Sequence, residues 1–141
     1  MTKKFEFSTD TPETRIRVYG KTVQELFGNA LAGMASFIKT DIFETKKKEW
    51  GISQEIRVQA VDIASLLVEF VSSALAHTDA HQAVFCDASF SKFGENFLEG
   101  TIRGLAVSEF DHDIKAVSYQ DVEVSKNPET GMYETVLVFE I

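Results

Sequence analysis

Carboxylates near both ends of the chain are the residues whose types and spacing best suit them to chemistry. Asp10 and Glu13 come just before the alternating segment 15–19, and Glu140 precedes Ile141, which carries the terminal carboxylate. If these two segments are neighbouring strands, up to four carboxylates converge, and they repel one another unless a cation or a basic residue intervenes. Hard oxygen ligands of this kind suit Mg²⁺ or Ca²⁺. Isolated acids near chain ends are normally solvated, so both interpretations stay open.

Histidine and cysteine provide weaker candidates. His77 and His81 are four residues apart with Asp79 between them, a spacing that fits a zinc site on one helical face. The same segment fits the C-terminus of a helix, where the helix dipole favours histidine. Cys86 lies in an apolar segment without a nearby cation, which indicates a buried structural thiol. His112, between two aspartates, is most simply a polar loop residue.

The composition predicts one globular domain over residues 1–141. Hydrophobic residues make up 44% of the chain and charged residues 26%, which excludes a disordered or fibrous protein. A single cysteine excludes an internal disulfide as well as Cys₄ and Cys₂His₂ zinc sites. The apolar runs are too short to span a membrane. Residues 1–6 lack the apolar core of a signal peptide, so a cytoplasmic location is expected.

The charge balance bears on the class of partner. There are 22 acidic and 14 basic residues, and the net charge of −8 argues against a domain whose main task is to grip nucleic-acid phosphates. The three lysines at 46–48 either contact RNA or are solvated, and they lack interleaved aromatic residues on which bases stack. The sequence contains no glycine-rich phosphate loop and no nucleophile elbow. An autonomous enzyme is therefore the weakest hypothesis.

The first helix is indicated by a capping box and by its apolar periodicity. Thr22 and Glu25 are placed so that each satisfies a free backbone N–H, and apolar residues then recur at spacings of three and four to about residue 39. Gly28 and Gly33 lie inside this helix. Each costs roughly 1 kcal/mol relative to alanine unless close packing requires it.

The second helix follows Asp62, a favourable N-cap, and its apolar stripe is wide enough to predict burial on more than one side. Elsewhere the apolar period falls to two, as in strands. The last strand is apolar on both faces and is expected to be central. The fold class is therefore α+β, with two amphipathic helices packed on mostly antiparallel sheet layers. The predicted strands are 15–19, 55–59, the pair 83–90 and 97–105, and the pair 115–124 and 133–141, which is joined by a turn at 127–131.

This pattern resembles the archease family, the small protein cofactors of the RNA ligase that joins 3′-phosphate to 5′-hydroxyl ends. Archeases open on an aromatic and acidic segment that leads into D-H-T-A-D-x-G-I-R-x-Y-G, and here residues 5–20 read FEFSTDTPETRIRVYG. The resemblance covers nearly the whole chain at matching spacings. It continues in the capped helix after Thr22, the helix after Asp62 with Leu66, Leu67 and Val68, the segments 90–93 and 115–119, and the final Glu140 and Ile141.

The resemblance implies a metal site built from the opening loop and the end of the chain. Glu13 takes the place of the second aspartate of the motif, Glu140 takes that of the penultimate acid, and Ile141 contributes a main-chain oxygen. Asp10 is a candidate replacement ligand. The metal would be Ca²⁺, Mg²⁺ or Mn²⁺. The implied role is to help an RNA-splicing ligase become guanylylated and turn over repeatedly, with RNA engaged only indirectly and no bond made or broken by the archease itself.

The motif also departs from the family pattern. Thr9 and Asp10 replace Asp-His, Pro12 replaces Ala and Arg15 replaces Gly, while Gln120 replaces the His that normally follows Ala-Val-x-Tyr. Both retained acids are glutamate where aspartate is usual. These changes keep open a second hypothesis, in which the chain is a chaperone-like or scaffolding adaptor that has lost the metal role.

Overall fold

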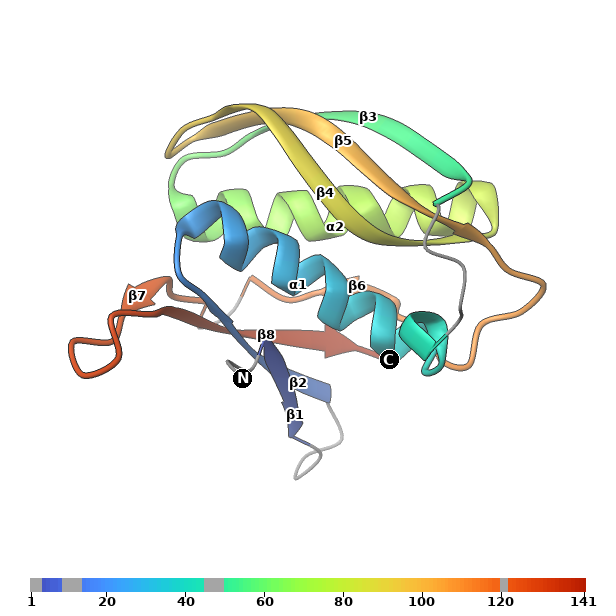
Figure 1. Cartoon of the computed structure of the whole chain (residues 1–141), viewed down its shortest axis with the longest axis horizontal. Coiled ribbons are helices and arrows are strands. Elements are labelled where there is room, and N and C mark those ends of the chain that lie inside the picture. Colours follow the sequence, from blue (N-terminus) through green and yellow to red (C-terminus); the bar gives the residue numbers. More distant parts are fainter. Residues whose placement is uncertain (1–3, 9–13, 45–49, 120–121) are drawn as a thin grey trace.

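Two antiparallel sheets enclose a pair of helices in the computed structural model, which describes residues 4–8, 14–44, 50–119 and 122–141 (Figure 1). The five-stranded sheet has the order β1-β2-β8-β6, with β7 also paired to β8, and the three-stranded sheet has the order β3-β5-β4. This is the predicted α+β architecture. The elements are β1 (Phe5–Ser8), β2 (Thr14–Gly20), α1 (Val23–Ile38), the 3₁₀ turn η1 (Ile42–Glu44), β3 (Ile52–Gln59), α2 (Ile63–His81), β4 (Ala83–Phe93), β5 (Phe97–Ala106), β6 (Ala116–Val117), β7 (Ser125–Lys126) and β8 (Tyr133–Glu140).

Both helices begin where the sequence predicts. The Thr22 hydroxyl accepts a hydrogen bond from the Glu25 N–H at 3.0 Å, and the Asp62 carboxylate accepts one from the Ser65 N–H at 2.8 Å. Each side chain thereby satisfies a backbone donor that the first helical turn leaves free. The second helix ends at Gln82, whose left-handed backbone (φ 49°) lets its N–H reach a carbonyl of the preceding turn.

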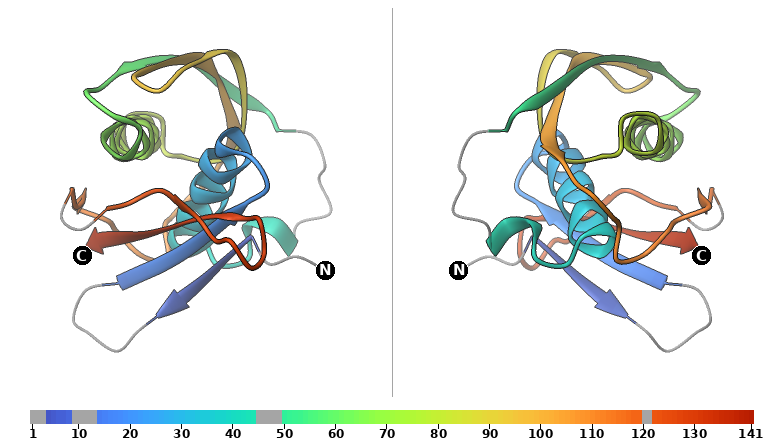
Figure 2. Two further views of the ribbon diagram at one scale, coloured as in Figure 1. Left: turned by 90° about the vertical axis from the view of Figure 1, so that its left-hand side faces the viewer. Right: turned by 90° about the vertical axis from the view of Figure 1, so that its right-hand side faces the viewer.

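The helices lie side by side between the sheets, as the end-on views show (Figure 2). The α2 helix contacts all three strands of the three-stranded sheet on one side, and α1 and β6 on others, so it is buried on more than one side as expected. The core contains an aromatic cluster in which Phe27 packs against Phe70, Phe90 and Phe93, with ring centroids 4.9–6.5 Å apart.

The two glycines of α1 serve different purposes. A Cβ added to Gly33 would overlap the Cδ1 atom of Ile16 and lie 3.2 Å from the Cγ of Phe5, so close packing of α1 against β1 and β2 requires this glycine. A Cβ added to Gly28 meets nothing within 4 Å. Close packing therefore explains the glycine at position 33, whereas it does not explain the glycine at position 28.

The C-terminal strand is central, as its apolar faces predict, because β8 lies between β2 and the short strands β6 and β7. The predicted strand 115–124 is wrong for most of its described length, since among its described residues only Ala116–Val117 forms a strand, before Ser125–Lys126 pairs further along. Val117 and Ser125 are eight residues apart, whereas their partners Phe139 and Glu134 are only five residues apart. This spacing is three residues too long for a regular ladder, and the described residues 118–119 and 122–124 lie outside any strand.

No helix in the described ranges is long and apolar enough to cross a lipid bilayer.

Candidate cation site at the end of β8

The pairing of β2 with β8 brings together the two parts of the chain that carry the predicted ligands. The two strands run antiparallel in unbroken register from Thr14 opposite Phe139 to Gly20 opposite Tyr133. Thr14 is the first described residue after 9–13, and it lies opposite the residue just before Glu140. On the other side of β8, the N–H of Lys115 donates to the Glu140 carbonyl at 2.7 Å. The end of β8 is thus held from both sides (Figure 1).

The ligands that the structure describes fit a hard cation. The Glu140 side chain is exposed, and its carboxylate has no hydrogen-bond or ion-pair partner among the described residues. Ile141 is 52% exposed. A carboxylate and a main-chain oxygen are the donors that Ca²⁺ and Mg²⁺ prefer.

Asp10 and Glu13 lie outside the described residues, so their assignment as ligands stays a prediction. Within the ranges that are described, no three His, Cys, Asp or Glu side chains converge.

An aromatic stack supports the end of β8 from the helix side. The Phe37 ring lies 5.9 Å from the ring of Phe139, 6.0 Å from that of Phe7, and 4.6 Å from the His112 imidazole, which is nearly parallel to it. Phe139 is fully buried. These ring contacts join the C-terminus of α1 to the strand that ends in Glu140. The backbone that carries this carboxylate therefore packs against the end of the helix.

His112 lies exposed in a loop, as expected, and its contacts with the end of α1 add a structural role. Its Nδ1 lies 2.9 Å from the Phe37 carbonyl, and its backbone N–H donates to the Ile38 carbonyl at 3.3 Å. These contacts satisfy carbonyl groups that the last turn of α1 leaves without helical partners. The partners are more than 70 residues apart in sequence, so no local pattern around His112 signals the contact.

The neighbouring Asp111 is already engaged by the same helix end. Its carboxylate accepts hydrogen bonds from the Thr40 N–H at 2.8 Å and the Thr40 hydroxyl at 3.0 Å, and it lies 3.7 Å from the Lys39 ammonium. These hydrogen bonds, the one from the backbone first, lower the pKa of Asp111. Asp111 therefore closes α1 and is not an available ligand.

The structure also describes the candidate cysteine and the histidine pair, but not the three lysines. Cys86 is buried, and burial, with a smaller contribution from the Asp87 charge, raises the pKa of its thiol to about 12. This confirms the structural thiol. His77 and His81 lie in the last turn of α2, as the interpretation of a helix C-terminus predicts. The lysines at 46–48 lie outside the described residues.

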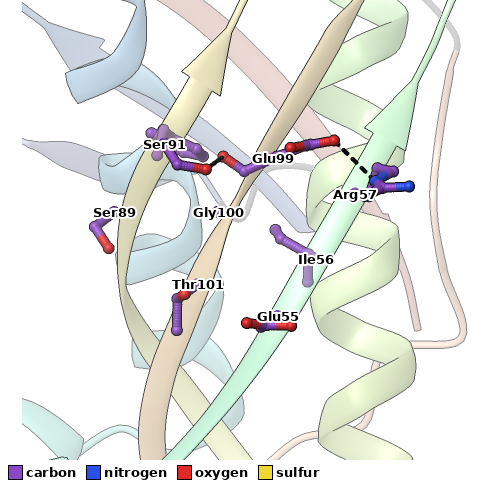
Figure 3. A pocket seen from close by; sticks show the side chains of 9 residues that line it. Glu55, Ile56, Arg57, Ser89, Ser91, Glu99, Gly100 and Thr101 are labelled. Atoms are coloured by element: carbon purple, nitrogen blue, oxygen red, sulfur yellow. Dashed lines mark hydrogen bonds and ion pairs between the residues drawn. The ribbon is translucent and has the colours of Figure 1, made fainter.

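A hollow of about 730 Å³ lies elsewhere, on the outer face of the three-stranded sheet (Figure 3). Of its charged side chains, Arg57 pairs with Glu99 at 2.9 Å, and Lys92 nearby approaches the same carboxylate at 3.8 Å, whereas Glu55 has no ion-pair partner among the described residues. Both helices separate this face from β8 (Figure 1). Like the rest of the described part of the chain, this face carries no cluster of three metal-ligating side chains.

Comparison with known proteins identifies the family. Residues 5–141 match the archease protein family (MTH1598/TM1083). The chain is 29% identical to the Methanosarcina mazei protein archease, covering 99% of this chain and 97% of that one. It is 30% identical to the Methanosarcina barkeri protein archease, covering 96% and 95%.

Two solved structures show the same fold. The solution structure of Methanobacterium thermoautotrophicum protein 1598 superposes with a TM-score of 0.77 at 21% identity, covering 98% of this chain and 99% of that one. The crystal structure of a Thermotoga maritima archease, described as a possible chaperone, gives a TM-score of 0.58 at 15% identity, covering 90% and 89%. With the family match over nearly the whole sequence, these findings show that the chain belongs to the archease family.

Proposed function

We propose that this chain is a non-catalytic accessory protein that activates an RNA ligase joining 3′-phosphate to 5′-hydroxyl ends. It does so through a divalent cation, Ca²⁺, Mg²⁺ or Mn²⁺, held where β2 begins and β8 ends. Glu140 supplies a carboxylate, Ile141 a main-chain oxygen, and Glu13, with Asp10, the acids of the opening loop. The observation that carries the proposal is the register of β2 on β8, with Thr14 opposite Phe139.

The electrostatics of the described residues support a cation at this end. Glu140 is an exposed carboxylate without a compensating partner in the described ranges, whereas Asp111 already accepts two hydrogen bonds from Thr40 and lies 3.7 Å from the Lys39 ammonium. A bound divalent cation would supply a concentrated positive charge able to attract phosphate oxygens. The residues of this chain would hold that charge and present it from a rigid strand end to the ligase.

Activation without catalysis fits the remaining side chains. Cys86 is buried with its pKa raised, and the imidazole of His112 is stacked on Phe37 at the end of α1. In the described part of the chain these two groups do not form a nucleophile paired with a base, which is the arrangement that covalent catalysis needs. Bond making would then belong to the ligase, and RNA would be contacted only through it.

The test is a guanylylation and multiple-turnover assay of the partner ligase with and without this protein. The wild-type protein should accelerate both steps, and Glu140→Ala should abolish the acceleration. Glu55→Ala is the matched control, because Glu55 is also exposed and unpaired in the described part of the chain but lies on the distant three-stranded sheet. An active ligase that shows no response to the wild-type protein would overturn the proposal.

The departures in the opening motif favour a second candidate, a chaperone-like or scaffolding adaptor on the same fold. Titration calorimetry with Ca²⁺, Mg²⁺ and Mn²⁺ separates the two. Binding that disappears in Glu13→Ala supports the activator. Absence of binding, together with a stable complex between this protein and the ligase, supports the adaptor.

A further inference from the structure

The strand β4 has a free edge that the proposed activation does not use. In the described part of the chain, β4 pairs only with β5, so it lies at one side of the three-stranded sheet. In a strand at such a position, every second residue points its N–H and C=O groups away from the sheet. Apart from the pairing with β5, the backbone between Cys86 and Phe90 forms no hydrogen bond with any described residue. These groups are available to one more strand.

A hollow of about 600 Å³ follows this edge where β4 passes α1 (Figure 1). Five consecutive residues of β4, 86–90, line the hollow. Because successive side chains of a strand point to opposite faces, the feature that all five can present to one hollow is their backbone edge. The opposite wall is one side of α1, on which four lining residues follow at helical spacing: Glu25, Gly28, Asn29 and Ala32.

We propose that this hollow binds an extended, basic peptide segment of a partner protein, which adds to β4 as a fourth strand of the sheet. In this mode of recognition the main chain provides affinity through hydrogen bonds, and alternate side chains provide specificity. A peptide of about five residues matches the length of the stretch 86–90. The site is independent of the proposed cation, because the hollow adjoins the first half of α1, whereas the end of β8 packs against its last turn.

The wall formed by α1 leaves room and a hydrogen-bond acceptor for the peptide. A Cβ added to Gly28 meets nothing within 4 Å, and Ala32 presents only a methyl group, so a second chain can approach the helix closely. Asn29 is 9% exposed, and its Nδ2 donates to the Tyr19 carbonyl at 2.7 Å. The Oδ1 atom of this amide has no hydrogen-bond partner among the described residues and can accept an N–H from the peptide.

The other lining side chains indicate the chemistry of the peptide. Glu25 on α1 and Asp87 on β4 place a carboxylate on each wall, against one described ammonium, that of Lys4. The Glu25 carboxylate has no ion-pair partner in the described ranges, so a lysine or arginine of the peptide would supply one. Phe43 and Trp50 offer an apolar surface, since their rings meet edge to face at 6.4 Å and Phe43 is 47% exposed. We therefore expect a peptide that combines basic and apolar side chains.

Electrostatic repulsion disfavours a second copy of this chain as the occupant. If β4 paired with its own copy, Glu25 and Asp87 of one molecule would approach those of the other, and each molecule carries a net charge of −8. Like charges that face one another across an interface are unfavourable. A basic peptide meets the opposite situation.

The test starts from a phage-displayed library of random peptides that is panned on immobilised wild-type protein. Enriched peptides are synthesised with a fluorescent label, and their affinity is measured by anisotropy. The expected result is a shared pattern of alternating apolar residues with at least one basic residue, bound with a micromolar Kd. Sedimentation of the wild-type protein alone should show a monomer.

Substitutions at the helix wall test where the peptide binds. Gly28→Leu fills the hollow and should weaken binding by at least about tenfold. Gly28→Ala is the matched control, because one methyl group leaves most of the space open, and it should bind the peptide as the wild type does. Glu25→Gln should weaken binding about two- to fivefold, whereas Glu55→Gln, on the outer face of the sheet, should not. Thermal unfolding checks that each variant is folded.

Two backbone measurements distinguish strand addition from docking through side chains alone. N-methylation of one alternate set of peptide residues should weaken binding by at least about tenfold, because those N–H groups pair with β4, and N-methylation of the other set should have little effect. Hydrogen–deuterium exchange at residues 86–90 should slow when the peptide binds. A library without any binding peptide, full affinity in folded Gly28→Leu, or unchanged exchange at 86–90 would each overturn the inference. So would a wild-type dimer that Gly28→Leu dissociates, because a second copy would then occupy the edge.

Discussion

The acidic residues of this chain differ in how far hydrogen bonds and ion pairs already engage their carboxylate oxygens. Asp62 accepts an N–H at the start of α2, Asp111 accepts two donors of Thr40, and Glu99 lies between Arg57 and Lys92. Glu140 has no such partner among the residues described. Its availability is what makes the loss of Glu140 a test of cation binding and not of folding.

The single cysteine allows a reactivity prediction at the same scale. Burial raises the Cys86 pKa from its ordinary 9.0 to about 12, so its thiolate fraction near neutral pH falls roughly a thousandfold. A thiol reagent such as dithionitrobenzoate should modify native protein very slowly and denatured protein at the rate of a free thiol. The measurement is the absorbance of the released thiol with and without urea. Rapid modification of the native protein would show that the β4 segment opens readily.

Local sequence could suggest some roles and not others. Glu140 and Ile141 are predicted as ligands from their chemistry and family position, and that assignment stays a prediction. The structural role of His112 could not be predicted, because it depends on where the end of α1 lies, more than 70 residues away. The engagement of Asp111 depends on the same long-range contact. Residue type indicates what a side chain can do, and only the fold decides what it meets.

At the scale of elements, the two glycines of α1 provide a matched pair. Gly28→Ala adds a methyl group into open space and should stabilise the protein by about 0.5–1 kcal/mol through helix propensity. Gly33→Ala gains the same propensity but forces a methyl group against the fully buried Ile16, so a net loss of about 1–2 kcal/mol is expected. Urea unfolding of both variants measures the difference. Equal stabilisation by both substitutions would contradict the packing of α1 on β2.

The N-cap of α2 predicts a pH dependence. The hydrogen bond from the Ser65 N–H lowers the Asp62 pKa below its ordinary 3.8. A carboxyl group with a lower pKa in the folded state stabilises the fold above its unfolded pKa and loses that contribution as the pH falls through the folded value. Asp62→Asn keeps a capping oxygen that does not titrate. The stability lead of wild type over Asp62→Asn should therefore shrink below about pH 4, as thermal unfolding between pH 2 and 7 would show. A lead that is constant across this range would contradict the prediction.

Helices that are defined by local sequence signals could be predicted, whereas strands whose extent depends on the strand they pair with could not. The caps at Thr22 and Asp62 and the apolar period behind them define both helices without reference to the rest of the chain. The break in the predicted strand 115–124 has a different origin. It arises from a mismatch of three residues against β8, which is a property of two segments together. The short edge strand β1 was likewise not predicted, because its four residues provide too little alternation.

At the scale of the whole molecule, the layered fold and the net charge act together. The net charge of −8 attracts any cation weakly, while the sheet fixes the ends of β2 and β8 side by side, where the proposed site would add specificity. A cation that binds only the folded chain stabilises it by about 2.7 kcal/mol at a free concentration of 100 times its Kd. Added Ca²⁺, Mg²⁺ or Mn²⁺ should therefore raise the melting temperature of the wild type.

The same titration separates specific binding from general screening. Potassium chloride at matched ionic strength relieves repulsion among the acidic residues without occupying the proposed divalent site. It should therefore raise the melting temperature less than the divalent salts do. Glu140→Ala should respond to divalent cations only as much as it does to potassium, whereas Glu55→Ala should keep the full wild-type response. Differential scanning calorimetry of the three proteins provides the comparison. Equal responses in wild type and Glu140→Ala would mean that the −8 charge is merely screened and that the end of β8 holds no cation.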